Sequence, residues 1–510
     1  MPLSMPERPH LDSFRRQARA LQRAVRAGEP DAVERVARCL PRVVDEAGGF
    51  RLSAAQFVIA REYGFGSWPR LGRYLVTAAE HACDTRAGAV PATDPADEFC
   101  RLACLTYSRA DGPERWAGAQ RLLAERPDLT SSNIWAAAAS ARPEDVGRLL
   151  GEQPGLVAER GGPFRWRPLF HLAYSRFDPA VPAERVLAVA RQLLDAGADP
   201  NDGYLFDGLP QPFTVLTGVF GHGELGSRRQ PPHPRWQALG RLLLEAGADP
   251  NDAQALYNRM FEPDDSHWEL LFDHGLGTGD GGPWRARIAE LDPPARLLRV
   301  RLRWAIEHHQ SARVRLLVEH GVDFHSPFED DGPAWSPANG RTPVELAQLN
   351  GDRETADHLV TRGATPPGPD PVRDLIAAAF RADRSALDRV RSEHPDAVAE
   401  ARRSRPGLIV WAAARAGAET VALLAELGFD VNAYGRGDAP VEEAWETALH
   451  HSAMAGDVEL TRRLLDLGAD PDLRDRRFDA TPLDWARHVH RTATADLLEP
   501  LTTTTDPVRD

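Results

Sequence analysis

The sequence repeats itself, and this constrains the fold more than any other feature. The segment TALHHSAMAGDVELTRRLLDLGAD begins at Thr447, and a related segment, TPLDWARHVHRTATADLL, begins 34 residues later at Thr481. Copies of the ending recur upstream, as LLDAGADPND from Leu193 and LLEAGADPND from Leu243. A period of this length is typical of proteins that stack one small unit many times. The 510 residues are therefore expected to form mainly one long stack rather than several unlike domains.

One unit of the repeat predicts two short helices joined by a turn. Thr481 precedes Pro482, which places a capping hydroxyl ahead of a proline at the first helical position. In the unit from Thr447, Gly456 ends the first helix and Gly468 ends the second, because glycine adopts the left-handed conformation at little cost. Such a pair cannot bury its apolar face alone and must stack on copies of itself.

These residues resemble the ankyrin-repeat family, whose units are about 33 residues long and begin T-P-L-H-x-A. The resemblance is strongest over residues 447–498, good at 191–202, 241–252 and 342–364, and degenerate elsewhere. It implies an all-α fold, an α-solenoid of stacked helix-turn-helix units. The motif histidine is present only as His450, while Asp484, Glu345 and Phe170 stand at its position in other units. The hydrogen bonding that the family builds around this histidine is therefore not expected throughout.

Four segments are expected along the chain. Residues 1–80 are predicted to form a helical N-terminal cap, 81–97 a linker, 98–500 the solenoid of about ten or eleven degenerate units, and 501–510 a disordered tail. The part at 50–76 is similar to a segment that begins many bacterial ankyrin-repeat proteins. Its side chains Phe57, Trp68, Leu71 and Leu75 are expected to cover the open end of the stack.

Composition limits the partners and the compartment. The chain has 61 basic residues, all of them arginine, against 75 acidic residues, giving a net charge of −14. An acidic chain is a poor candidate for binding nucleic acid or an anionic membrane surface. No apolar run approaches the roughly 18 residues of a membrane helix, and the start lacks the apolar core of a signal peptide. We expect a cytoplasmic protein, and the absence of lysine fits coding in a GC-rich, bacterial genome.

Function is expected in insertions that exceed the repeat period, because extra residues in a stack must form loops. The longest lie at 202–213, 221–236, 324–340 and 432–446. In the last two, aromatic and acidic residues combine, which suits a basic peptide or protein surface; alternatively, such aromatics fold inward and pin their own loops. The predicted partner-binding residues are Phe328, Asp330, Asp331, Trp335, Tyr434, Glu442, Glu443 and Trp445.

Signatures of catalysis are scarce. The sequence has no P-loop, no G-x-S-x-G and no H-E-x-x-H, and without lysine it cannot form a Schiff base. Neither a cofactor nor a metal site is expected. The best remaining polar group lies in the irregular middle repeats, residues 202–284, where an alternative ligand site would comprise His222, Arg228, Arg229 and His233.

The sequence thus predicts a non-enzymatic scaffold or adaptor that binds another protein, with a basic surface preferred, through its concave face and insertion fingers. Two alternatives stay open. One is a small-molecule-binding or enzymatic role in the irregular middle repeats, and the other is an inhibitory or immunity-type binding protein. The identity of the partner and the oligomeric state are not determined by the sequence.

Overall fold

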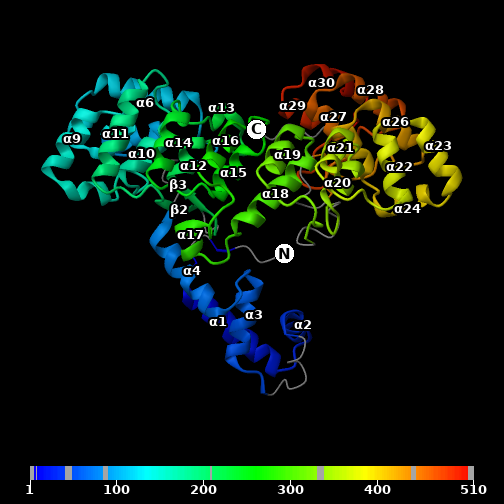
Figure 1. The fold of residues 1–510 in the computed structure, drawn as a ribbon, viewed down its shortest axis with the longest axis horizontal. Helices are drawn as coiled ribbons and strands as arrows, with labels where there is room; N and C mark the ends of the chain where they lie inside the picture. Colours follow the sequence, from blue (N-terminus) through cyan, green and yellow to red (C-terminus); the bar gives the residue numbers. More distant parts are fainter. Residues whose placement is uncertain are drawn as a thin grey trace. The chain divides into compact units, whose positions relative to one another are not determined.

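A computed structural model describes residues 5–6, 9–40, 49–83, 90–206, 210–329, 338–437 and 444–503. The chain is mostly helical (Figure 1), as the repeat pattern predicts, and it divides into two compact units, residues 1–297 and 298–510. Within the described ranges, no helix is both long and apolar enough to cross a bilayer.

The first unit begins with a helical module that has its own apolar core. Its helices are α1 (Leu11–Arg26), α2 (Pro30–Cys39), α3 (Leu52–Glu62) and α4 (Trp68–His81). The apolar positions of α1 recur at helical spacing, and Phe14, Ala18, Leu21 and Val25 are all buried, as an amphipathic helix requires. Helix α1 packs against α2 and α3, and α3 packs against α4.

A small sheet connects this module to the repeats. Strand β1 (Ala82–Cys83) runs parallel to β2 (Gly203–Phe206), with Ala82 opposite Leu205, and β2 pairs antiparallel with β3 (Pro212–Thr214). The His81 ring lies 3.1 Å from the carbonyl oxygen of Gly203. Residues 82–83, which the sequence places in a linker, are thus part of a sheet.

The N-terminal module packs on the edge of the repeats that carries β2. Leu71 and Leu75 of α4 belong to the same buried cluster as Leu205, Trp284 and Ile288, and α4 contacts both β2 and α17 (Gly282–Arg287). The prediction that these leucines cover the open end of the stack is therefore wrong. The prediction fails because these leucines pack against apolar surface from a strand and a helix that lie much later in the sequence.

Helix pairs make up the rest of the first unit. Helices α8, α10, α12 and α15 pack in succession, and so do α9, α11, α14 and α16. The elements are α5 (Pro95–Ala103), α6 (Pro113–Glu125), α7 (Leu129–Ser132), α8 (Ile134–Ala139), α9 (Pro143–Glu152), the 3-10 helix η3 (Pro154–Ala158), α10 (Pro168–Tyr174), α11 (Ala183–Asp195), α12 (Val215–Phe220), α13 (Gly226–Arg229), α14 (Trp236–Glu245), α15 (Ala253–Arg259) and α16 (Ser266–Asp273).

The second unit has the same construction. Its elements are α18 (Pro294–Glu307), which begins before the boundary, α19 (Ser311–Glu319), α20 (Pro343–Leu349), α21 (Arg353–Thr361), α22 (Pro371–Phe380), α23 (Arg384–Glu393), α24 (Ala397–Ser404), α25 (Leu408–Arg415), α26 (Ala418–Glu426), α27 (Ala448–Ala455), α28 (Val458–Asp466), α29 (Pro482–His488) and α30 (Thr492–Leu498). Helices α25, α27 and α29 pack in succession, as do α26, α28 and α30.

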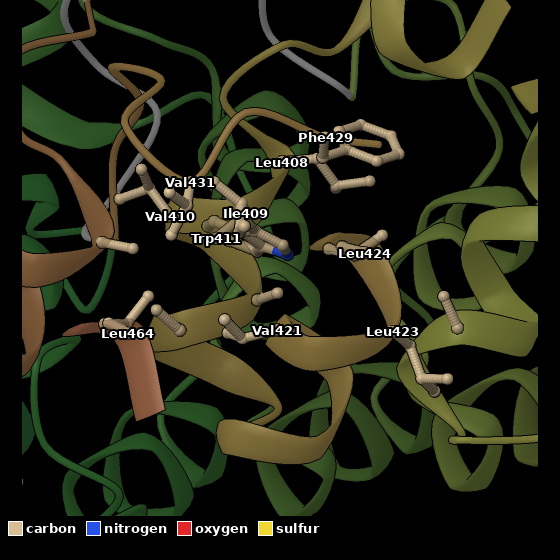
Figure 2. Close-up of a cluster of buried hydrophobic side chains, with 14 of the residues drawn as sticks. Leu408, Ile409, Val410, Trp411, Val421, Leu423, Leu424, Phe429, Val431 and Leu464 are labelled. Atoms are coloured by element: carbon tan, nitrogen blue, oxygen red, sulfur yellow. The ribbon is translucent and has the colours of Figure 1, made fainter. Parts of the chain in front are cut away.

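The core of the second unit is continuous across successive pairs. Figure 2 shows Ile409 and Trp411 of α25 together with Val421 and Leu424 of α26, and Leu464 of the next pair lies in the same buried cluster. Each helix pair buries its apolar side chains against the following pair. A single pair on its own would therefore leave these side chains exposed to water.

Asparagine side chains link the loops of consecutive pairs. Asn432 donates from Nδ2 to the carbonyl of Gly468 at 3.2 Å and accepts from the backbone N–H of Asp470 at 2.8 Å. In the first unit, Asn201 bonds the carbonyl of Gly247 and the N–H of Asp249 in the same way, both at 2.8 Å. Each asparagine thereby fixes its loop to the end of the following repeat.

Candidate functional site

The repeat that begins at Thr447 is organised by a buried histidine. The backbone N–H of Thr447 donates to Nδ1 of His450 at 3.2 Å, so Nε2 carries the proton and donates to the carbonyl of Ala480 at 3.0 Å. Burial lowers the pKa of His450, which keeps the ring in this neutral tautomer. One side chain thus caps α27 and also holds the loop that precedes α29.

Acidic residues replace this histidine in two other repeats. The backbone N–H of Thr342 donates to Glu345 at 2.8 Å, and that of Thr481 donates to Asp484 at 2.9 Å. Both carboxylates complete capping boxes, the motif in which a threonine and an acidic residue three positions later cap the start of a helix together. They cap their own helices, whereas His450 also reaches the next loop.

That next loop is built around Asp475. Its carboxylate is buried and accepts the backbone N–H groups of Arg477, Phe478 and Ala480 at 2.7–3.0 Å, as well as the indole N–H of Trp485 at 3.0 Å. A buried carboxylate with this many donors rigidifies the backbone around it. The tip of the loop is therefore held in one conformation.

An exposed aromatic residue lies on this rigid loop. Phe478 is 59% exposed, although its ring contacts Trp445 and Trp485, with centroids 6.1 and 5.3 Å away. The guanidinium of Arg477 lies 5.8 Å from the Phe478 ring centre. The Phe478 ring therefore presents apolar surface to solvent while two tryptophan rings hold its base.

Tyr434 is tied to the same loop. The Tyr434 hydroxyl donates to the carbonyl of Arg474 at 2.7 Å, and the guanidinium of Arg476 lies 4.0 Å from its ring centre. We call the side chains of Tyr434, Trp445, Arg476, Arg477 and Phe478 the C-terminal finger surface. Its composition of aromatic and arginine side chains is that of energetically dominant residues at protein–protein interfaces.

The ankyrin repeat family model matches residues 445–476. The chain contains an ankyrin repeat. This match includes Trp445, His450 and Arg476, and its C-terminal edge enters the loop held by Asp475. Ankyrin repeats are protein–protein interaction motifs, and the matched residues contribute Trp445 and Arg476 to the C-terminal finger surface.

The structure brings two of the predicted partner-binding residues, Tyr434 and Trp445, into the C-terminal finger surface. Trp445 is only 8% exposed and its ring contacts that of Phe478, so its prediction as an exposed anchor is wrong.

Phe328 is 5% exposed, and the guanidinium of Arg299 lies over it, 4.9 Å from the centre of the Phe328 ring. The same prediction is wrong for Phe328, because Arg299 also bonds the carbonyls of neighbouring loop residues and holds the loop closed over the ring. Asp330, Asp331, Trp335, Glu442 and Glu443 lie outside the described residues.

The alternative ligand site does not assemble as predicted. His222 and His233 are buried, whereas Arg228 and Arg229 are exposed. Burial, and then the positive charge of Arg259, lowers the pKa of His222 to about 4. The histidines thus face inward as neutral rings while the arginines face solvent, and the four side chains do not form one pocket.

A buried cysteine and histidine lie close together in the first unit. Sγ of Cys104 is 3.7 Å from Nδ1 of His171, the arrangement of a nucleophile and its base. Burial raises the pKa of Cys104 to about 12 and lowers that of His171 to about 4. A thiol that stays protonated and out of contact with solvent cannot act on a substrate.

Among the described residues, no cluster of three or more His, Cys, Asp or Glu side chains is placed to bind a metal.

Replacing Asp475 with Asn should destabilise the C-terminal repeats by about 2 kcal/mol, because the new amide N–H₂ faces two donors, the Ala480 N–H and the Trp485 indole. Urea unfolding of both proteins measures this change. Asp479→Asn is the control, since Asp479 lies in the same loop with an exposed side chain, and it should change stability by less than about 0.5 kcal/mol. Equal effects of the two substitutions would contradict the role given to Asp475.

Sequence reasoning missed Arg476, Arg477 and Phe478. The sequence predicts function in loops longer than the repeat period, whereas the loop at 470–480 belongs to a repeat of ordinary length. A signal was present nonetheless, since the run Arg-Arg-Phe just before Thr481-Pro482 places a large apolar residue in an otherwise charged turn.

Proposed function

We propose that this chain is a non-enzymatic scaffold or adaptor of the ankyrin type, an α-solenoid that binds another protein through its C-terminal finger surface. The observation that carries the proposal is Phe478, an aromatic side chain 59% exposed to solvent on a loop that a buried carboxylate holds rigid. A preorganised anchor loses little conformational freedom on binding. The ankyrin repeat at 445–476 supports the same type of partner.

The chemistry of the surface suggests how a partner would fit. Phe478 would enter an apolar pocket of the partner. Arg476, which lies over the Tyr434 ring, and Arg477, which lies over the Trp445 ring, would meet acidic or carbonyl groups at the rim of that pocket. The basic partner surface expected from Asp330, Asp331, Glu442 and Glu443 stays a prediction. An adaptor and an inhibitor would use the same surface.

Replacing Phe478 with Ala should weaken partner binding about 30-fold, the effect of losing roughly 2 kcal/mol at a dominant interface residue. Affinity capture from the source cells, followed by quantitative mass spectrometry, compares the wild type with Phe478→Ala. Val76→Ala is the matched control, because Val76 is 60% exposed but lies on α4 in the N-terminal module. Proteins that bind the wild type and the control but not Phe478→Ala are the expected partners. Recovery of the same proteins with all three baits would overturn the proposal.

A further inference from the structure

Helix α1 carries a row of arginines on its exposed side. Arg16, Arg19, Arg23 and Arg26 are all exposed to solvent. At about 3.6 residues per turn they lie within about 80° of one another around the helix axis, and at about 1.5 Å per residue they extend over about 15 Å. We call these four side chains the α1 arginine face.

The opposite side of α1 is held in the core of the N-terminal module. Its apolar side chains are at most 4% exposed, namely Phe14, Ala18, Leu21 and Val25. Gln22 and Arg26 donate to the carbonyl of Phe50, both at 3.1 Å, and the helix packs on α2 and α3. The arginine face is therefore carried by a helix whose position is already fixed, which lowers the entropy lost on binding.

The positive charges of this face are not balanced within the helix. The side chains of Arg16, Arg19 and Arg23 form no hydrogen bond or ion pair with any residue that the structure describes. The only acidic residue of α1, Asp12, pairs with Arg15 at 2.8 Å. Successive arginines of the face stand three or four residues apart, the spacing at which like charges destabilise a helix. An acidic partner would remove this repulsion.

The excess of positive charge is local to the N-terminal module. Residues 1–80 contain 13 arginines and 9 acidic residues, whereas the whole chain contains 61 arginines and 75 acidic residues. Charges at physiological salt are screened beyond about 8 Å. A partner in contact with α1 therefore meets the arginines rather than the acidic remainder of the chain.

We propose that the α1 arginine face binds an acidic segment of a partner protein, whose carboxylates recur every three or four residues along a helix. Guanidinium groups donate charge-assisted hydrogen bonds to carboxylates, and the spacing of the arginines matches that of side chains on one side of a helix. The face lies in the first unit and the C-terminal finger surface in the second. The proposal thus goes beyond the proposed function and does not rest on Phe478.

Two other classes of partner fit this face less well. Proteins that bind single-stranded nucleic acid stack its bases on aromatic side chains, and the one aromatic residue of α1, Phe14, is buried. Helices that bind a membrane surface insert apolar side chains into it, and none of the large apolar side chains that the structure shows as exposed lies on α1. An acidic protein segment requires neither feature.

Fluorescence anisotropy with a labelled peptide of about 20 residues, or roughly 30 Å of helix, tests the proposal. Its glutamates occupy one side of the helix at spacings of three and four, and alanine fills the other positions. The full chain should bind it, and Arg19→Gln combined with Arg23→Gln should bind at least tenfold more weakly. Arg61→Gln combined with Arg73→Gln is the control, because it removes the same charge from exposed positions on α3 and α4. Equal weakening by the two pairs, or no binding by the wild type, would overturn the proposal.

A second pair of variants separates loss of charge from loss of the fold. Arg19→Lys combined with Arg23→Lys keeps both charges and should bind the peptide within about threefold of the wild type. Without peptide, the glutamine pair should unfold at the same temperature as the wild type or higher, because it removes like-charge repulsion. A lysine pair that binds as weakly as the glutamine pair, or a glutamine pair with a lower unfolding temperature, would contradict the proposal.

The other classes of partner are tested with the same proteins. A single-stranded oligonucleotide with the charge of the peptide should bind more weakly than the peptide, and vesicles containing phosphatidylserine should not retain the protein on flotation. Tighter binding of the oligonucleotide, or retention on vesicles that the Arg19 and Arg23 substitutions abolish, would overturn the assignment to a protein partner. None of these measurements uses partner capture, so failure of the Phe478 experiment leaves them interpretable.

Discussion

Replacing Glu307 with Gln should raise the free energy of unfolding of the second unit by about 3 kcal/mol at pH 8 and leave it nearly unchanged at pH 4. Glu307 ends α18 and is only 2% exposed, and its Oε1 has no hydrogen-bond partner among the described residues. Burial raises its pKa from 4.5 to about 7, against smaller opposing effects of Arg303 and Arg415.

The direction of the pH dependence follows from these values. Between pH 4.5 and 7, the folded protein holds a proton on Glu307 that the unfolded chain has released. The free energy of unfolding therefore falls as the pH rises through this range, and above pH 7 the full penalty of a buried carboxylate remains. Glutamine has the same shape and never ionises, so it removes the penalty.

Urea unfolding at pH 4, 6 and 8 measures the effect. Glu319→Gln changes the charge equally at an exposed position paired with Arg362, and it should alter stability by less than about 0.5 kcal/mol. If Glu307→Gln gave no gain at pH 8, or the same gain at pH 4, the carboxylate would not be uncompensated in the folded state.

His308, the neighbour of Glu307, should make stability depend on pH in the opposite direction. The His308 ring stacks on Trp304 with centroids 3.6 Å apart, and its Nδ1–H donates to the Trp304 carbonyl at 2.8 Å. Burial, and then the charge of Arg415, lowers the pKa of His308 to about 3. Below pH 6.5 the unfolded chain takes up a proton that the folded protein excludes, so stability falls as the pH falls, by about 3 kcal/mol at pH 4.

His308→Phe keeps a ring on Trp304 and removes the titration, at the expense of one hydrogen bond worth about 1 kcal/mol. The variant should therefore be less stable than the wild type at pH 7 and more stable at pH 4, and urea unfolding at these two pH values measures the reversal. His394→Phe, at an exposed position, should keep the wild-type pH dependence. If His308→Phe changed the free energy of unfolding by the same amount at both pH values, the lowered pKa assigned to His308 would be ruled out.

Local features of the fold were predictable because their causes are local. The Thr342, Thr447 and Thr481 caps begin helices where the sequence places them, and Gly468 ends α28 with a positive φ. These signals need only neighbouring residues. The packing of the N-terminal module could not be predicted in this way, since its apolar surface is completed by Leu205, Trp284 and Ile288 from distant repeats.

The candidate site was predicted only in outline. The sequence indicated the correct finger through Tyr434 and Trp445, but the direction of an aromatic side chain in a loop depends on tertiary partners. Trp445 is covered by Phe478, and Phe328 is covered by Arg299.

The shared core of the N-terminal module also affects how the protein folds during synthesis. Helices α1–α4 leave the ribosome first, but Trp284 and Ile288, which complete their buried cluster, follow about 200 residues later. At typical elongation rates this interval lasts about 10–40 s. During that time the part of the cluster that Leu205, Trp284 and Ile288 cover in the folded protein stays exposed, and we expect this apolar surface to be the part of the nascent module most prone to aggregation.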